Sequence, residues 1–131
     1  MRLKRAVTQP RLRVPAVADL DTLFKGFADP TRIRILNVLA AGELCVCDIV
    51  GLLRLSQPTV SRHLAYLRRT GLAEARPDLR FTYYRLAGAK DPIHRNLIAC
   101  VRTCFPGISS LDRERESAGT RVAERKASPC A

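Results

Sequence analysis

The residues best suited to chemistry in this 131-residue chain are its five cysteines: Cys45, Cys47, Cys100, Cys104 and Cys130. An odd number of cysteines, with no secretory signal ahead of them, argues against a structural disulfide framework. Reduced thiolates are soft ligands for thiophilic metal and metalloid ions, and thiols can also sense oxidation. We therefore treat the cysteines as candidate ligands or redox sensors, with inert thiols in the protein interior as the alternative.

The spacing of the cysteines limits how they can act. On a regular helix, at about 100° per residue, Cys45 and Cys47 would point about 200° apart. They can hold one ion only if the start of the helix is irregular or becomes so, and we expect ion binding to compete with regular helical geometry there. Cys100 and Cys104 are four residues apart and so share one helix face. Cys130 is a further candidate ligand.

The balance of charge indicates the kind of partner. The chain has 23 Lys and Arg against 12 Asp and Glu, a formal net charge of +11. Such a balance favours a polyanion, with nucleic acid ahead of an anionic membrane. No constellation of nucleophile, base and orienting group is present, and the C-x-C pair has no positioned base, so we expect no enzyme. The basic N-terminus is followed by no apolar run, and no stretch approaches the roughly 18 apolar residues of a membrane span. We therefore expect a cytoplasmic protein without a membrane partner.

The stretch from Ser56 to Arg69 predicts a helix with one apolar face. Ser56 is a favourable N-cap, Pro58 suits the first turn, and Val60, Leu64 and Leu67 recur at helical spacing. Short polar side chains and cations occupy the rest of the helix, which predicts contacts to base edges and phosphates. The predicted DNA contacts on this helix are Ser56, Gln57, Thr59, Ser61, Arg62, His63, Arg68 and Arg69.

The surrounding segments are those needed to position such a helix. Helical patterns cover residues 17–28, 31–41, about 43–53 and 92–104, and a three-residue turn before residue 57 predicts a helix-turn-helix. Residues 72–76 and 81–86 predict two strands joined by a turn, which form a wing. Arg76 and Arg80 on this wing are predicted DNA contacts. The predicted fold is mainly α with a small β-hairpin, a winged helix-turn-helix.

The chain divides into three predicted parts. Residues 1–15 are expected to be a flexible basic arm, and residues 16–105 the winged helix-turn-helix domain for DNA binding and dimerisation. The last helix of that domain has a small apolar stripe with little left to pack on, so we expect it to pair with its copy in a homodimer. Residues 106–131 have few apolar residues and mixed charges, which predicts a disordered tail.

Three motifs carry a family resemblance over residues 20–86. They are D-P-T-R-x-x-I-L at residues 29–36, E-L-C-V-C-D at 43–48 and S-Q-P-T-V-S-R-H-L at 56–64. In this order and spacing they resemble the ArsR/SmtB family of winged-helix repressors. The resemblance implies a homodimer with the first and last helices at its interface. It also implies that the protein binds double-stranded operator DNA in the ion-free state and leaves it when a metal or metalloid ion binds.

The resemblance also bears on which ion is sensed. In arsenic-responsive members, two cysteines spaced as Cys45 and Cys47 bind trivalent arsenic, and a third cysteine usually follows where Val50 stands here. Cadmium- and lead-responsive members share the motif but add cysteines from an N-terminal extension, which has none here. Zinc- and nickel-type members use Asp and His of the last helix; Asp91 and His94 lie there without the paired histidines. The resemblance implies a repressor released by arsenite as inducer, with no permanent cofactor. The same repressor answering cadmium or lead, or oxidation of its thiols, is the alternative.

Overall fold

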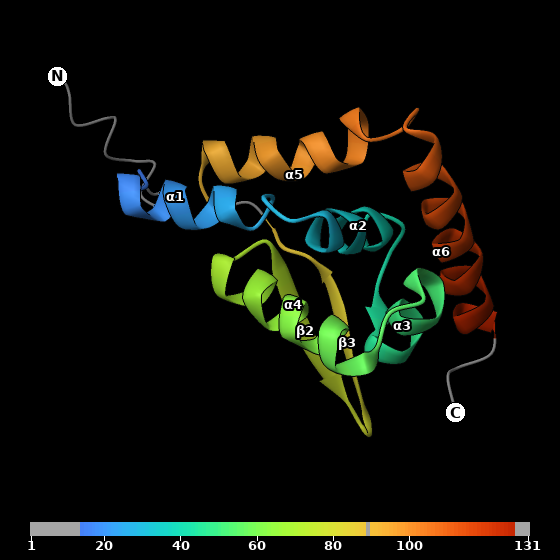
Figure 1. Ribbon diagram of the computed structural model, residues 1–131. Coiled ribbons are helices and arrows are strands. Elements are labelled where there is room, and N and C mark those ends of the chain that lie inside the picture. The colour runs from blue at the N-terminus through green and yellow to red at the C-terminus, as the bar shows by residue number, and fades with distance from the viewer. Residues whose placement is uncertain (1–13, 89, 128–131) are drawn as a thin grey trace, which may run out of the picture.

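The structure of the protein is a computed structural model that describes residues 14–88 and 90–127. Residues 1–13 of the predicted basic arm, and Cys130, lie outside the described residues. The elements follow in the order α1 (Val17–Lys25), α2 (Pro30–Leu39), β1 (Leu44–Cys45), α3 (Val46–Leu53), α4 (Gln57–Thr70), β2 (Ala73–Asp78), β3 (Phe81–Leu86), α5 (Pro92–Cys104) and α6 (Ser109–Ala127) (Figure 1).

The predicted helix-turn-helix is confirmed as α3 and α4. The Ser56 hydroxyl accepts the backbone N–H of Thr59 at 3.3 Å, and this bond sets the start of α4. Gly71 ends α4 in the left-handed conformation, at a φ of 82°, which a residue without Cβ adopts freely. Between the two helices Arg54 also has a positive φ, 56°, and this residue turns the chain into α4.

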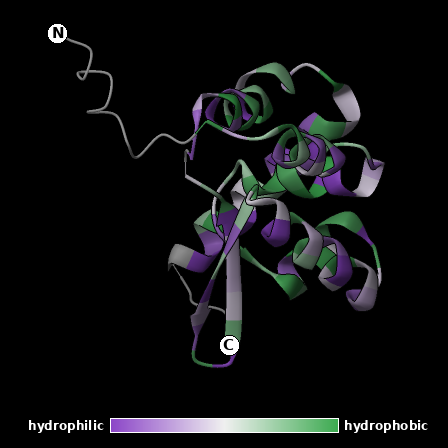
Figure 2. Ribbon diagram, turned by 90° about the vertical axis from the view of Figure 1, so that its left-hand side faces the viewer, coloured by the Kyte–Doolittle hydropathy of each residue, from purple (hydrophilic) through white to green (hydrophobic). Residues whose placement is uncertain are grey.

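The strands form a small antiparallel sheet in the order β1-β3-β2. The hairpin of β2 and β3 is the predicted wing, and it projects beyond the helices (Figures 1 and 2). Strand β1 was not predicted, because the apolar pattern predicts a helix that already includes Leu44. Instead Leu44 pairs with Tyr84 and Cys45 with Tyr83, so the segment that carries the first cysteine is joined to the wing.

The core lies where α2 packs against α4. Three residues of α4 that were predicted to face inward, Val60, Leu64 and Leu67, are fully buried. They belong to one cluster with Ile35 and Leu36 of α2. Hydrophobic and hydrophilic segments alternate along the helices (Figure 2), as expected for elements that each bury one face. This core is aliphatic, and it holds the recognition helix in place through its apolar face.

The expectation of a disordered tail is corrected by the structure, which has α6 over Ser109–Ala127. The few apolar residues of this segment are placed to be buried: Leu111, Ala118 and Val122 recur on one face and are at most 9% exposed. The helix packs on α2 and α3. Three of its charged side chains, Glu114, Arg121 and Arg125, form ion pairs across this contact, which the composition of the tail did not reveal.

Polar contacts complete the docking of α6 on α2. Arg34 makes a bidentate ion pair with Glu114, with an Nη2–Oε2 distance of 2.6 Å. The buried side chain of Asn37 donates to the carbonyl of Leu111 at 2.8 Å and accepts from Nε of Arg115 at 3.0 Å. Because a buried amide without partners is costly, these bonds specify the position of α6.

Candidate thiol site and DNA-contacting face

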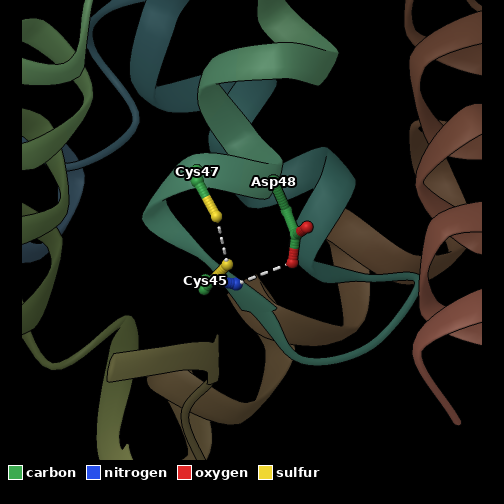
Figure 3. Close-up of side chains that lie close together, drawn as sticks. All are labelled: Cys45, Cys47 and Asp48. Carbon is green, nitrogen blue, oxygen red and sulfur yellow. Dashed lines mark hydrogen bonds between the residues drawn. The ribbon is translucent and has the colours of Figure 1, made fainter. Parts of the chain in front are cut away.

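Cys45 and Cys47 face each other at the start of α3 (Figure 3). Cys45 is the N-cap residue, with extended backbone angles of −89° and 170°, and Cys47 is the second residue of the helix. The two sulfurs are hydrogen-bonded at 2.9 Å. The angular separation of a regular helix therefore does not apply, since one sulfur comes from the residue before the helix. Of the two possibilities, a helix start that is already irregular or one that becomes so when an ion binds, the structure has the first, and the thiols already converge.

Asp48 closes this site from the other side. One carboxylate oxygen accepts the backbone N–H of Cys45 at 3.0 Å, and Cys45 and Asp48 form a reciprocal capping box. The two sulfurs and a carboxylate oxygen lie within 4.8 Å of one another, a spacing that could hold an ion. Sequence reasoning did not include Asp48. An acidic residue three positions after a cap residue is the signal that could have identified it.

The carboxylate of Asp48 is already engaged by α6. Nε of Arg121 lies 2.6 Å from one oxygen and Nη1 of Arg125 lies 2.9 Å from the other, and the Asp48 side chain is fully buried. Arg125 also donates to the carbonyl of Glu43. Burial opposes ionisation of Asp48, but the hydrogen bonds from Arg121 and from the Cys45 amide outweigh it and lower the pKa of Asp48. The arginines and the Cys45 amide therefore hold Asp48 as a buried anion.

The two thiols differ in their surroundings. Cys45 is 2% exposed, whereas Cys47 is exposed to solvent. Burial, together with the hydrogen bond to Cys47, raises the pKa of Cys45 to about 12. Cys45 is therefore a neutral thiol at neutral pH. A metal or metalloid that binds to its sulfur must displace the proton, so binding is coupled to the loss of the Cys45 thiol proton.

A pocket of about 470 Å³ adjoins the thiols. It lies between the start of α3, the start of α4 and strand β3 of the wing. Its lining is Cys45, Val46, Cys47, Val50, Gln57, Arg80, Phe81, Thr82 and Tyr84. The pocket therefore joins the candidate ion site to both elements that were predicted to contact DNA, since Gln57 begins α4 and Arg80 is at the tip of the wing.

The second pair of cysteines lies on α5, away from the first. A hydrogen bond to Cys104, assisted by burial, raises the pKa of Cys100. Cys104 is exposed. In Figure 1, α2 lies between α5, which carries the second pair, and α3.

The buried His94 near the start of α5 has a structural contact. Its Nε2 lies 2.5 Å from the carbonyl of Gly71, at the end of α4, and its backbone N–H is capped by Asp91. This bond ties the two helices together.

The predicted recognition face is displayed on α4. Gln57 and Arg62 are exposed, and so are Arg68 and Arg69 at the other end of the helix. Ser56 donates to the Thr59 hydroxyl at 2.8 Å, and Gln57 donates to the Ser61 hydroxyl at 3.0 Å. These bonds order short polar side chains at the helix start, where base edges would be met.

Two predicted DNA contacts, His63 and Arg76, are engaged by charged residues from other parts of the chain. His63 is only 14% exposed and lies against Asp29 and Arg32, with its Nδ1 3.3 Å from a guanidinium nitrogen of Arg32. Arg76 makes a bidentate ion pair with Glu43 at 2.8 Å. The spacing of His63 in the sequence did not show that it faces α2. Because of these partners, His63 lies outside the exposed face of α4. Arg76 remains a candidate DNA contact at the edge of the predicted surface.

The helix-turn-helix with its wing defines the class of protein as a DNA-binding transcription regulator. Residues 29–75 match the family model described as "Bacterial regulatory protein, arsR family". The chain is 39% identical over 80 residues to the arsenical resistance operon repressor of Staphylococcus aureus, covering 60% of this chain and 77% of that protein. The chain belongs to the ArsR family, whose members are DNA-binding regulators and not enzymes.

Other relatives differ in the ion that their names specify. The arsenical resistance operon repressor of Escherichia coli (strain K12) is 50% identical over 66 residues, or 50% of this chain and 56% of that protein. A cadmium resistance transcriptional regulatory protein homologue of Staphylococcus aureus is 41% identical over 69 residues, or 52% of this chain and 57% of that protein. The match thus spans little more than half the length of these two relatives.

Solved structures support the fold. HlyU from Vibrio cholerae is 31% identical with a TM-score of 0.59, covering 68% of this chain and 94% of that chain. The homodimeric winged helix-turn-helix DNA-binding domain of a Mycobacterium bovis regulator is 32% identical with a TM-score of 0.59, covering 67% of this chain and 79% of that chain. Among residues 14–88 and 90–127, no helix has the length and apolar character needed to cross a bilayer.

Proposed function

We propose that this protein is a transcriptional repressor that leaves its operator when trivalent arsenic bonds to the thiolates of Cys45 and Cys47. The observation that carries the proposal is the convergence of the two sulfurs, 2.9 Å apart, where the helix-turn-helix meets the wing. Soft thiolate pairs suit thiophilic ions. Relatives whose names specify arsenical resistance are consistent with arsenite as the inducer.

Ion binding would change the geometry of this junction. A metal–thiolate bond of about 2.3 Å and a bond angle of about 100° would hold the sulfurs about 3.5 Å apart. The hydrogen-bonded sulfurs are closer, at 2.9 Å, so bridging by an ion would move the two sulfurs apart. Cys45 both caps α3 and pairs with Tyr83 of the wing, so we infer that a change at its sulfur is passed to the contact between α3 and β3.

A small shift is sufficient to release DNA. Helix α3 packs on α4, and a change in its position alters how the recognition helix is presented. In a dimer, two recognition helices must lie about 34 Å apart to enter successive major grooves. Couplings of about 1–3 kcal/mol between sites already change affinity 5- to 150-fold. We infer that the arsenic-bound dimer loses this spacing.

The proposed DNA-contacting surface combines α4 and the wing. Polar residues at the start of α4 would meet base edges, and arginines at its end and on the wing would hold phosphates. The surface comprises Ser56, Gln57, Thr59, Ser61, Arg62, Arg68, Arg69 and Arg80, with Arg76 at its edge. The formal net charge of +11 supports the same partner.

The dimer interface is proposed at α1 and α5. Val17 and Phe24 of α1 are 82% and 52% exposed, which leaves large apolar side chains uncovered in the single chain. Ile93 and Leu97 on α5 are only partly buried. Pairing of these helices with their copies would cover the apolar surface. This assigns residues 16–105 to DNA binding and dimerisation, and the basic arm over residues 1–15 remains a prediction.

The experiment is fluorescence anisotropy of reduced protein on DNA from upstream of its own gene. We expect tight binding and release by micromolar arsenite. Cadmium and lead are titrated in parallel, since release by them at lower concentrations than arsenite would reassign the inducer. Absence of operator binding at moderate salt would overturn the repressor itself.

A second trigger is favoured by the adjacent thiols of α5. Cys100 and Cys104 are four residues apart on α5 and therefore share one helix face, and Cys104 is exposed. Oxidation to a disulfide would be an alternative signal on the same repressor, and the same residues are candidate additional ligands. Release by peroxide without metal, reversed by a thiol reductant, would identify the oxidative trigger. Cys130 is a further candidate ligand that the described residues do not include.

A further inference from the structure

Among residues 14–88 and 90–127, the thiol site offers an ion two sulfurs and no third donor that is free within it. Asp48 is close enough to be a ligand, but Arg121 and Arg125 each bond one of its carboxylate oxygens. To coordinate an ion, Asp48 would have to give up these buried ion pairs. Val50 stands where a third cysteine could have been, and it lines the adjoining pocket. Trivalent arsenic makes three bonds, so two thiolates leave one bond for another group.

The third bond of an arsenic atom held between the sulfurs faces a partly apolar pocket. Four of the lining side chains other than the cysteines are apolar or aromatic: Val46, Val50, Phe81 and Tyr84. With inorganic arsenite, the third bond ends in a hydroxyl, whose burial against apolar side chains is unfavourable unless it is hydrogen-bonded. With a carbon substituent, the same surroundings are favourable.

We propose that the preferred ligand is a monosubstituted organic arsenical, R–As(OH)2, with an aromatic group R that fills the pocket beside Phe81. This inference rests on the proposed function and names the ligand class of the same site. The reaction is R–As(OH)2 + 2 Cys–SH → R–As(S–Cys)2 + 2 H2O. Two arsenic–oxygen bonds are exchanged for two arsenic–sulfur bonds, each thiol proton leaves in water, and arsenic stays trivalent.

The position of the pocket gives such a ligand a direct effect on DNA binding. Gln57 at the start of α4 and Arg80 at the wing tip both line the pocket and both belong to the proposed DNA-contacting surface. An aromatic group between them would occupy space beside the DNA and hold the wing apart from α4. The organic ligand would therefore release the operator by obstruction as well as through the movement of α3.

The test compares phenylarsenous acid, methylarsenous acid and arsenite. The protein is the full chain with Cys100→Ser, Cys104→Ser and Cys130→Ser, so that Cys45 and Cys47 are the remaining thiols. Calorimetry measures binding, and anisotropy on operator DNA measures release. We expect phenylarsenous acid to act at concentrations at least tenfold below arsenite, with methylarsenous acid between them. Native mass spectrometry should show one phenylarsenic group per chain and the loss of two thiol protons.

Three variants distinguish the contribution of the pocket to binding from that of the thiols. Phe81→Leu should reduce the advantage of phenyl over methyl several-fold, whereas Leu79→Ala, at the fully exposed wing tip, should not. Val50→Cys should strengthen arsenite binding at least tenfold by supplying a third sulfur. Equal potency of phenylarsenous acid and arsenite would overturn the inference and leave the proposed function standing. If none of the three compounds binds to the two-thiol protein, both fail.

Discussion

The guanidinium of Arg121, on the last helix, lies 2.6 Å from the carboxylate of Asp48, which caps the helix that carries Cys47. Arg125 reaches the other oxygen of the same carboxylate. These ion pairs connect α6 to the thiol site. Helix α6 is also hydrogen-bonded to the C-terminal part of α5, because Arg115 donates to the carbonyls of Val101 and Arg102. Helix α6 thus spans from the thiol site to the proposed dimer helix.

Removing Arg125 should destabilise the fold. The Arg125→Gln variant leaves a fully buried carboxylate with one cationic partner fewer, and we expect a loss of about 1–3 kcal/mol in the free energy of unfolding. Urea denaturation of the full chain measures it. The matched control is Arg113→Gln, an exposed arginine on the same helix, which should change stability by less than about 0.5 kcal/mol. Equal losses in both variants would mean that the ion pair with Asp48 has no special role.

The thiols at α3 should be required for release but not for DNA binding. We expect the Cys45→Ser, Cys47→Ser double variant to bind operator DNA with an affinity within about threefold of the natural chain, because both side chains are small and the cap geometry tolerates a hydroxyl. Arsenite should no longer release it. The measurement is anisotropy under reducing conditions, with Cys100→Ser, Cys104→Ser as the comparison. Arsenite release that persists without the α3 thiols would move the site to α5, and a weakened response in the comparison would make the α5 thiols additional ligands.

Stability should fall in mild acid because of His63. Burial lowers the pKa of His63 below its usual value of 6.5, against the opposing effect of Asp29. The unfolded chain then binds the proton more tightly than the folded one, so the stabilisation is complete above 6.5 and is lost as the pH falls through the folded-state pKa. Urea midpoints between about pH 7.5 and 5.5 test this. The decrease should be smaller in His63→Gln, and an unchanged pH profile in that variant would contradict the assignment.

Arg62 should contribute more to operator binding than Arg76. Arg62 is exposed on the recognition helix, whereas Arg76 is held by Glu43. We expect Arg62→Ala to weaken binding about tenfold and to reduce the slope of log affinity against log salt by about 0.9 for each phosphate that is no longer neutralised. Arg76→Ala should lower affinity by about threefold or less, because its charge is already partly offset within the chain. If the two variants bind the operator equally weakly, the placement of α4 as the principal reading element is wrong.

The sequence alone was enough to predict the helix-turn-helix and the wing, and to indicate that Cys45 and Cys47 are candidate ion ligands. Ser56, Pro58 and the apolar repeat of Val60, Leu64 and Leu67 are local signals, because caps and helical periodicity depend on neighbours a few residues away. For the same reason Cys45 and Cys47 could be recognised as a candidate ion site. The family motifs, which are also local, extended that prediction to arsenic.

Only the tertiary structure decided how the cysteines are arranged. Strand β1 exists because Cys45 pairs with Tyr83, a partner 38 positions along the chain, and this pairing makes Cys45 a cap residue whose sulfur meets that of Cys47. The order in α6 depends likewise on distant partners, since Arg121 and Arg125 are paired only when Asp48 is brought to them. Periodicity carries no information about such contacts. His63 illustrates the same limit. The sequence of its helix predicts a DNA contact, but in the structure His63 lies against Asp29 and Arg32.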